Sequence, residues 1–184
     1  FNEGKYPSTN IQLDIFKKQL EIIENEGIKF IHPSNFEESL KKMKNERKIL
    51  LTIDDGLLSF YENAWPILKE RNIPFILFVS TREVGAFNYM NWEQIKELNN
   101  SDNVEIGNHS HSHEYLVEKT SAEIRDDIIK SINNFEEKLG RNSKFFSYPF
   151  GEYSLELKKI IKDLKFKYAF GQHSGVIDLS KDKF

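Results

Sequence analysis

Residues 49–56 read Ile-Leu-Leu-Thr-Ile-Asp-Asp-Gly, an apolar run that leads into two adjacent carboxylates and a glycine. A second apolar run, Val-Glu-Ile-Gly-Asn at 104–108, is followed directly by His-Ser-His-Ser-His at 109–113. Short apolar runs predict buried strands, and polar residues that follow them lie in loops held by a rigid scaffold. Both runs therefore place acidic and imidazole groups at the ends of strands, where an α/β fold keeps its chemistry.

Apolar runs of this kind alternate with longer amphipathic segments along the chain. Strands are expected at 28–31, 49–53, 74–80, 104–108, 145–148 and 166–170. Helices are expected from a cap at Thr9 or Asn10 to Gly27, from Pro33 over Met43, and at 58–70, 91–98, 121–139 and 154–164. This alternation predicts parallel strands with helical crossovers, hence an α/β barrel or an open sheet. The chain is expected to stop before such a barrel would close.

The composition is that of an ordinary soluble protein and excludes several function classes. The 184 residues are 39% hydrophobic and 30% charged, which predicts one domain, residues 1–184, with a substantial core. A net charge of −3 gives no support to nucleic-acid binding, and without cysteine any metal must be held by imidazole and carboxylate. No apolar stretch approaches the roughly 20 residues that span a membrane.

The chain begins with Phe1 rather than Met, so a missing upstream segment is expected. The compartment (cell envelope, periplasm or cytoplasm) and the oligomeric state are left open.

The two carboxylates can play different roles because neighbouring residues at a strand end point to opposite sides. If Asp55 binds a metal, Asp54 is free to take a proton from a water molecule. The alternative is a simple turn, for which Asp-Asp-Gly is also suitable chemistry. The preceding apolar strand and the histidine cluster favour the functional interpretation.

His109 and His113 have the spacing at which, on a helical turn, two rings share one face and suit Zn²⁺ or a similar ion. His111, between them, is expected to point away. The alternative is a polar loop that happens to contain histidine. Three of the five histidines fall within these five residues, which argues against that alternative. His32, beside Pro33, is interpreted as structural.

A third segment, 145–153, reads Phe-Phe-Ser-Tyr-Pro-Phe-Gly-Glu-Tyr. A strand that enters Pro-x-Gly predicts a rigid turn with free N–H groups, which can stabilise an oxyanion, although most such turns are only turns. Most aromatic residues at regular spacing belong to the core. Of the aromatic residues able to stack on a sugar, Tyr148 and Tyr153 are kept as pocket candidates.

Taken in this order, the segments resemble the polysaccharide deacetylase family (carbohydrate esterase family 4, the NodB homology domain). Residues 52–56, Thr-Ile-Asp-Asp-Gly, are similar to its T-F-D-D-G motif. Residues 105–113 are similar to its H-[ST]-x-x-H metal motif with the E-I-G-[NS] lead-in. The resemblance extends over residues 6–175, and the two motifs at this separation are specific.

The resemblance implies a distorted (β/α)7 barrel of the NodB homology type. Whether this chain contains both ends of that barrel is left open. The resemblance implies that Asp55, His109 and His113 bind one divalent ion, for which Zn²⁺ is expected first and Co²⁺, Ni²⁺ or Fe²⁺ are compatible. It also implies that Asp54 is the general base and that the Phe150 N–H is the oxyanion donor.

The family's R-x-P-[YF]-G motif is matched only by Pro149, Phe150 and Gly151, with Ser147 in the place of the arginine. Residues 148–153 and the opening segment 5–10 are similar to the branch that deacetylates poly-N-acetylglucosamine. Tyr148, Pro149, Gly151 and Tyr153 are therefore expected to bind substrate. The family's late L-x-H motif has no clear match, His173 being the nearest candidate, so the general acid is not assigned.

The resulting hypothesis is a metal-dependent hydrolase that removes N-acetyl groups from an N-acetylglucosamine-type polysaccharide or oligosaccharide. One alternative is a deacylase of a small non-sugar amide. Another is a sugar-binding domain whose catalytic apparatus has decayed. A structural metal site is the least favoured interpretation, because three ligands leave a coordination position open.

Overall fold

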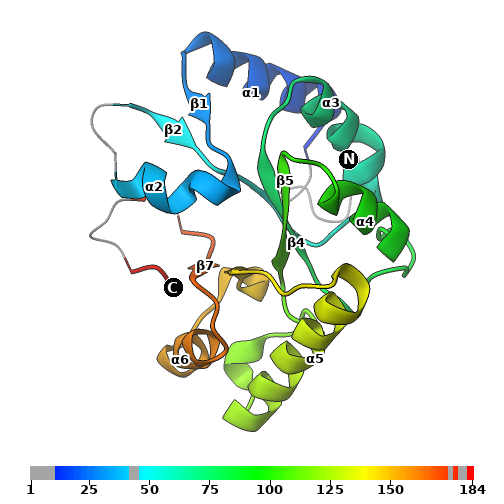
Figure 1. The fold of residues 1–184 in the computed structure, drawn as a ribbon, viewed down its shortest axis with the longest axis vertical. Helices are drawn as coiled ribbons and strands as arrows, with labels where there is room; N and C mark the ends of the chain where they lie inside the picture. Colours follow the sequence, from blue (N-terminus) through cyan, green and yellow to red (C-terminus); the bar gives the residue numbers. More distant parts are fainter. Residues whose placement is uncertain (1–10, 42–45, 174–175, 178–181) are drawn as a thin grey trace.

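The computed structural model describes residues 11–41, 46–173, 176–177 and 182–184 (Figure 1). The strands are β1 (Lys29–Phe30), β2 (Lys48–Ile49), β3 (Leu51–Ile53), β4 (Phe75–Val79), β5 (Val104–Asn108), β6 (Phe145–Ser147) and β7 (Tyr168–Phe170). The α-helices are α1 (Leu13–Asn25), α2 (Phe36–Lys41), α3 (Trp65–Glu70), α4 (Trp92–Asn99), α5 (Ser121–Leu139) and α6 (Leu155–Asp163). The predicted alternation of strands and helices is confirmed.

All pairings between these strands are parallel, in a sheet of order β3-β4-β5-β6-β7 and a separate pair β1-β2. Figure 1 shows the strands curling through the middle of the molecule with the helices around them. The architecture is a curled parallel sheet, a half-barrel consistent with the expected distorted (β/α) barrel. Because every strand runs the same way, all the loops that follow the strands gather at one edge.

The core has two sides because β4 is buried on both faces, as its unbroken run Phe-Ile-Leu-Phe-Val predicts. Phe75, Leu77 and Val79 face the outer helices, where they pack with residues of α1, α3 and α4. Ile76 and Phe78 face the concave side and pack with Phe36 and Leu40 of α2 and with Phe145 and Tyr168. Helix α2 therefore closes the concave side of the half-barrel.

Local signals account for the helix boundaries near the site. Capping boxes start α4 at Asn91 and α5 at Thr120, each satisfying backbone N–H groups of the first turn. Helix α5 ends at Gly140, which has φ 72° and so adopts the left-handed conformation that terminates many helices. The two capping boxes thus fix where these helices begin.

Several expected boundaries are wrong in detail. The strand expected at 49–53 is broken at Leu50, and its two parts, β2 and β3, lie in different sheets. Helix α1 begins at Leu13, with Gln12 as a cap that makes no side-chain bond, so the expected cap at Thr9 or Asn10 is wrong. Residues 9 and 10, like the opening segment 5–10 and Met43, lie outside the described residues.

The helix expected at 58–70 contains a π-helical segment, Phe60–Ala64, ahead of α3. Pro66 at the start of α3 has no N–H to donate, which is consistent with the wider turn before it. Among the described residues, no helix is long and apolar enough to cross a membrane.

Candidate metal centre

The carboxylate pair lies where β3 ends and the chain turns. Asp55 has φ 75° and Gly56 φ 73°, so two successive left-handed residues reverse the backbone directly after the strand. The turn is held in place by the Met90 N–H, which donates to the carbonyl of Gly56 at 2.9 Å. Asp-Asp-Gly is therefore a turn, and this turn also carries the candidate ligand.

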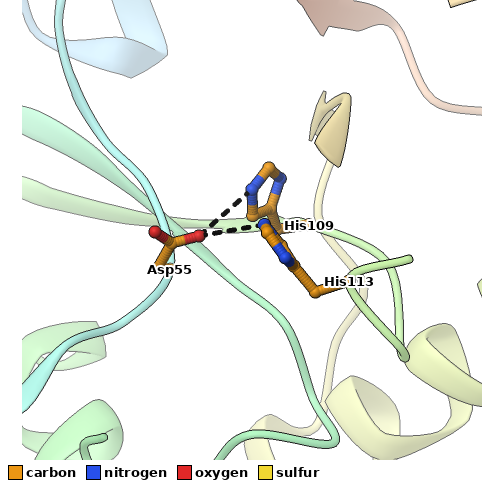
Figure 2. A group of neighbouring side chains, drawn as sticks. All are labelled: Asp55, His109 and His113. Atoms are coloured by element: carbon orange, nitrogen blue, oxygen red, sulfur yellow. Dashed lines mark ion pairs between the residues drawn. The ribbon is translucent and has the colours of Figure 1, made fainter. Parts of the chain in front are cut away.

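Asp55, His109 and His113 converge at one point (Figure 2). Asp55 Oδ1 lies 3.5 Å from His109 Nε2 and 3.1 Å from His113 Nε2. All three potential ligand atoms lie within 4.8 Å of one another. Two imidazole nitrogens and one carboxylate oxygen at such separations fit a divalent ion such as Zn²⁺ and leave coordination positions open. His173 does not join this group.

The loop that carries the histidines is not the helical turn expected from their spacing. Residues 109–113 are irregular, and both Ser110 (φ 69°) and His113 (φ 53°) are left-handed. These two conformations bring the ring of His113 to 4.9 Å from that of His109, measured between centroids. His111 turns away, as expected, and its Nδ1 lies 2.8 Å from Thr81 Oγ1.

The ring of His109 is oriented by a hydrogen bond at its second nitrogen. Its side chain is only 2% exposed, and Nδ1 donates to the carbonyl oxygen of Ser147 at 2.8 Å. That bond leaves Nε2 unprotonated in the neutral ring and directs it toward Asp55, the usual arrangement for a metal-binding histidine. Ser147, the residue in the place of the family's arginine, therefore supports the site through its main chain.

The two aspartates have opposite electrostatic environments. Burial raises the pKa of Asp54, and the neighbouring Asp55 charge adds to the effect. One oxygen of Asp54, Oδ1, is buried without a hydrogen-bond partner among the described residues. Burial would also raise the pKa of Asp55, but hydrogen bonds with His109 and His113 outweigh it and lower that pKa. Asp55 is thus the preferred anion of the pair.

His109 responds to the same charges. Burial alone would lower the pKa of His109, but the hydrogen bond to Asp55 and the charges of both aspartates raise it overall. A cation in this position is therefore favoured by the surroundings. A metal ion that displaces the proton of His109 would occupy an environment already arranged for positive charge.

The turn after β6 approaches the same centre. Phe150 has φ 60°, and its ring lies 4.8 Å from the ring of His113. The hydrogen bonds of the turn are donated by the N–H groups of Gly151, to Tyr148 O, and Glu152, to Pro149 O. The Phe150 N–H takes no part in these turn bonds, as an oxyanion donor requires.

The four residues expected to bind substrate have different environments. Pro149 and Gly151 are buried in the turn, and Gly151 is required there because it has φ 71° and a Cβ would lie 2.8 Å from Gln172 N. Tyr153 is 41% exposed and stays accessible, with the ring of His173 at 5.5 Å. Tyr148 is only 2% exposed and packs in the core, so it offers no stacking surface, which corrects that expectation.

A groove of about 340 Å³ opens beside His113. It is lined by His113, Glu114, Tyr115, Glu118, Lys119 and Phe150. Tyr115 stacks on Phe150, with centroids 4.0 Å apart and ring planes 5° from parallel. Both rings are more than two-fifths exposed. Tyr115 is not among the site residues predicted from the sequence, although an aromatic residue two positions after a candidate ligand is a usable signal.

The fold and the site together define an α/β half-barrel with an Asp-His-His group able to hold a metal at the carboxyl edge of its parallel sheet. The family model described as polysaccharide deacetylase matches residues 41–169, about 70% of the chain (129 of 184 residues). The chain belongs to the polysaccharide deacetylase family.

Individual relatives agree with this assignment. The chain is 30% identical, over an alignment 184 residues long, to a poly-β-1,6-N-acetyl-D-glucosamine N-deacetylase of Staphylococcus aureus strain MRSA252. That alignment covers 92% of this chain but only 63% of the relative, so the chain spans less than two thirds of its length.

Two solved structures share the fold. IcaB from Ammonifex degensii superposes with a TM-score of 0.83 at 28% identity, covering 93% of this chain and 79% of that one. The Streptococcus pyogenes deacetylase PplD, in complex with acetate, has a TM-score of 0.85 at 22% identity, covering 98% and 83% of the two chains. The latter likeness is evidence for the fold alone.

Proposed function

We propose that this domain is a metal-dependent hydrolase that removes N-acetyl groups from an N-acetylglucosamine-type polysaccharide or oligosaccharide. The observation that carries the proposal is the convergence of Asp55, His109 and His113. The carboxylate of Asp54 is adjacent to them, and its Oδ1 has no hydrogen-bond partner among the described residues. The S. aureus relative is named for deacetylation of such a polymer, which supports the substrate class.

The residues divide the work of amide hydrolysis between them. A divalent ion held by Asp55, His109 and His113, with Zn²⁺ the first candidate, would supply Lewis acidity at the acetamide carbonyl. Asp54, whose pKa is raised by burial, accepts the proton of the attacking water. The Phe150 N–H donates to the oxyanion that develops on the carbonyl oxygen. The amine departs as a neutral group once an acid has protonated it.

The groove beside His113 supports a sugar substrate rather than a small amide. Its wall is the exposed Tyr115–Phe150 pair, a flat apolar surface that suits the C–H face of a pyranose ring. The carboxylates of Glu114 and Glu118 and the ammonium group of Lys119 lie on the same groove and can bond sugar hydroxyls. A small acetamide would leave most of this surface unused.

Two substitutions test the proposal. Asp54→Asn should keep the metal and lower the rate of acetate release from N-acetylglucosamine oligomers by roughly 10²- to 10⁴-fold, the usual contribution of a general base. His113→Ala should lose metal and activity together, as measured by elemental analysis and acetate release. His111→Ala is the matched control, since His111 is an imidazole of the same loop outside the ligand group.

The outcomes separate the alternatives. Near-wild-type activity in Asp54→Asn would show that Asp54 is not the base. Wild-type protein that binds metal and oligosaccharide but releases no acetate would favour the sugar-binding alternative, which Ser147 in the place of the arginine supports. Faster turnover of small acetamides than of oligomers would favour the small-amide deacylase.

A further inference from the structure

The loop of residues 109–113 is hydrogen-bonded at nearly every main-chain group. All five of its N–H groups donate to a protein oxygen, and only one of them, that of His109, uses a strand carbonyl, Val79 O at 3.0 Å. The other acceptors are side chains: Asn108 Oδ1 for Ser110, Asp127 Oδ1 and Oδ2 for His111 and Ser112, and Ser110 Oγ for His113. The loop thus has a fixed path without belonging to a helix or sheet.

The opposite side of the loop is held by the segment after β4. The carbonyls of Ser110 and His111 accept from the N–H groups of Thr81 and Arg82, at 3.2 and 3.0 Å. The carbonyl of His109 accepts from Ser80 Oγ at 2.7 Å, and that of Ser112 accepts from the Arg82 guanidinium. The loop is therefore clamped between residues 80–82, which donate to its carbonyls, and Asp127, which accepts from two of its N–H groups.

Asp127 is the single carboxylate in this clamp. Its two oxygens accept from the N–H of His111 at 2.8 Å and of Ser112 at 3.0 Å, so one side chain fixes two successive peptide groups. Bonds to an ionised acceptor are roughly twice as strong as neutral ones. Both peptide groups lie between the left-handed residue Ser110 and the left-handed ligand His113.

The helix that supplies Asp127 is anchored in the core. Helix α5 is started by its capping box at Thr120, and Ile124 and Ile128, on either side of Asp127, are buried in the core. Asp127 is half-buried beside this stripe, whereas its neighbour Asp126 is exposed. The carboxylate is thus presented from a rigid element, which a loop residue would not achieve.

We infer that Asp127 is a positioning residue for the metal centre: it holds the peptide groups of His111 and Ser112 so that His113 meets Asp55 and His109. The inference rests on the metal centre of the proposed function but not on its substrate. Outer residues that orient metal ligands typically change metal affinity by 10- to 100-fold when they are replaced.

The experiment measures metal affinity, without turnover, by chelator competition with Zn²⁺ on the whole chain. Asp127→Asn keeps one acceptor oxygen, so its Zn²⁺ affinity should fall by about 10-fold. Asp127→Ala keeps none, so its Zn²⁺ affinity should fall further, by up to about 100-fold. Asp126→Asn makes the same charge change one residue away and should bind Zn²⁺ as the wild type does. Equal affinity in wild type and both Asp127 variants would overturn the inference.

Hydrogen exchange of the metal-free proteins gives a second, metal-independent measurement. The amide protons of His111 and Ser112 should exchange faster in Asp127→Asn than in wild type, and remain protected in Asp126→Asn. A general loss of stability, seen as faster exchange throughout α5 with unchanged Zn²⁺ affinity, would reduce Asp127 to a purely structural role. Weaker Zn²⁺ binding in a protein that never releases acetate would uphold the inference while the proposed function fails.

Discussion

Gly107→Ala tests whether the half-barrel is closely packed between β4 and β5. Gly107 lies on β5 directly opposite Phe78 of β4. A Cβ at this position would lie 2.3 and 2.4 Å from two ring carbons of Phe78, whereas ordinary contacts begin near 3.4 Å. The ring must therefore retreat by about 1 Å, yet Phe78 is fully buried and packs against Phe170.

Overpacking of this kind typically costs about 1–3 kcal/mol, and the severity of this clash predicts about 2–3 kcal/mol. For a chain of this length, such a loss lowers the melting temperature by roughly 4–12 °C. Thermal and urea unfolding should be followed for Gly107→Ala alone and in a Phe78→Val background, where the clashing ring carbons are absent. The cost should shrink by at least about 1 kcal/mol in that background. An equal cost in both backgrounds, or a cost below about 0.5 kcal/mol in the wild type, would refute the packing argument.

Three further predictions concern the site itself. His109 must lose its proton to bind metal, and its pKa is raised. Zn²⁺ affinity should therefore fall as the pH is lowered, and the fall should start above the ordinary histidine pKa of about 6.5. A Zn²⁺ affinity that stays constant from about pH 8 to about pH 6 would contradict this. Tyr115→Ala should lower kcat/KM for N-acetylglucosamine oligomers roughly 3- to 10-fold, while Tyr115→Phe, which keeps the ring, should stay near wild type. Gly151→Ala should lower the free energy of unfolding by about 1–3 kcal/mol, because the left-handed φ of Gly151 and the close approach of Gln172 both oppose a side chain. The loss should appear as a lower urea midpoint, and an unchanged midpoint would be inconsistent with this turn.

The strand–helix order and the place of the site could be read from the sequence because both depend on local signals. The unbroken apolar run of β4 predicts a strand buried on both faces, and the capping boxes at Asn91 and Thr120 mark helix starts. Parallel strands then require that the carboxylate pair and the histidine loop lie at one edge of the sheet. No long-range information was needed for that step.

Features that depend on distant contacts could not be read in this way. The spacing of His109 and His113 suggested a helical turn, but the loop is irregular because Asp127 and the segment 79–82 take its hydrogen bonds. Tyr148 was expected in the pocket as an aromatic residue able to stack on a sugar, yet its ring belongs to the core under α6. In both cases residues far along the chain decide the local conformation, which no local pattern encodes.

The adjacent carboxylates show how such contacts give two identical side chains different electrostatic environments. Asp54 and Asp55 have the same chemistry, but the histidine rings lower the pKa of Asp55 while burial raises that of Asp54. Pairs whose environments push their pKa values apart are suited to separate roles, here those of the proposed ligand Asp55 and the proposed base Asp54. Ser147 stands in the place of the arginine of the family's R-x-P-[YF]-G motif, so no cation from that position offsets the burial of Asp54. Ser147→Arg replaces the Ser147 hydrogen bond, which already lowers the pKa of Asp54, with a cation that should lower it further. The acidic limb of the pH–activity profile should then move to lower pH, and an unmoved limb would show that ionisation of Asp54 does not set it.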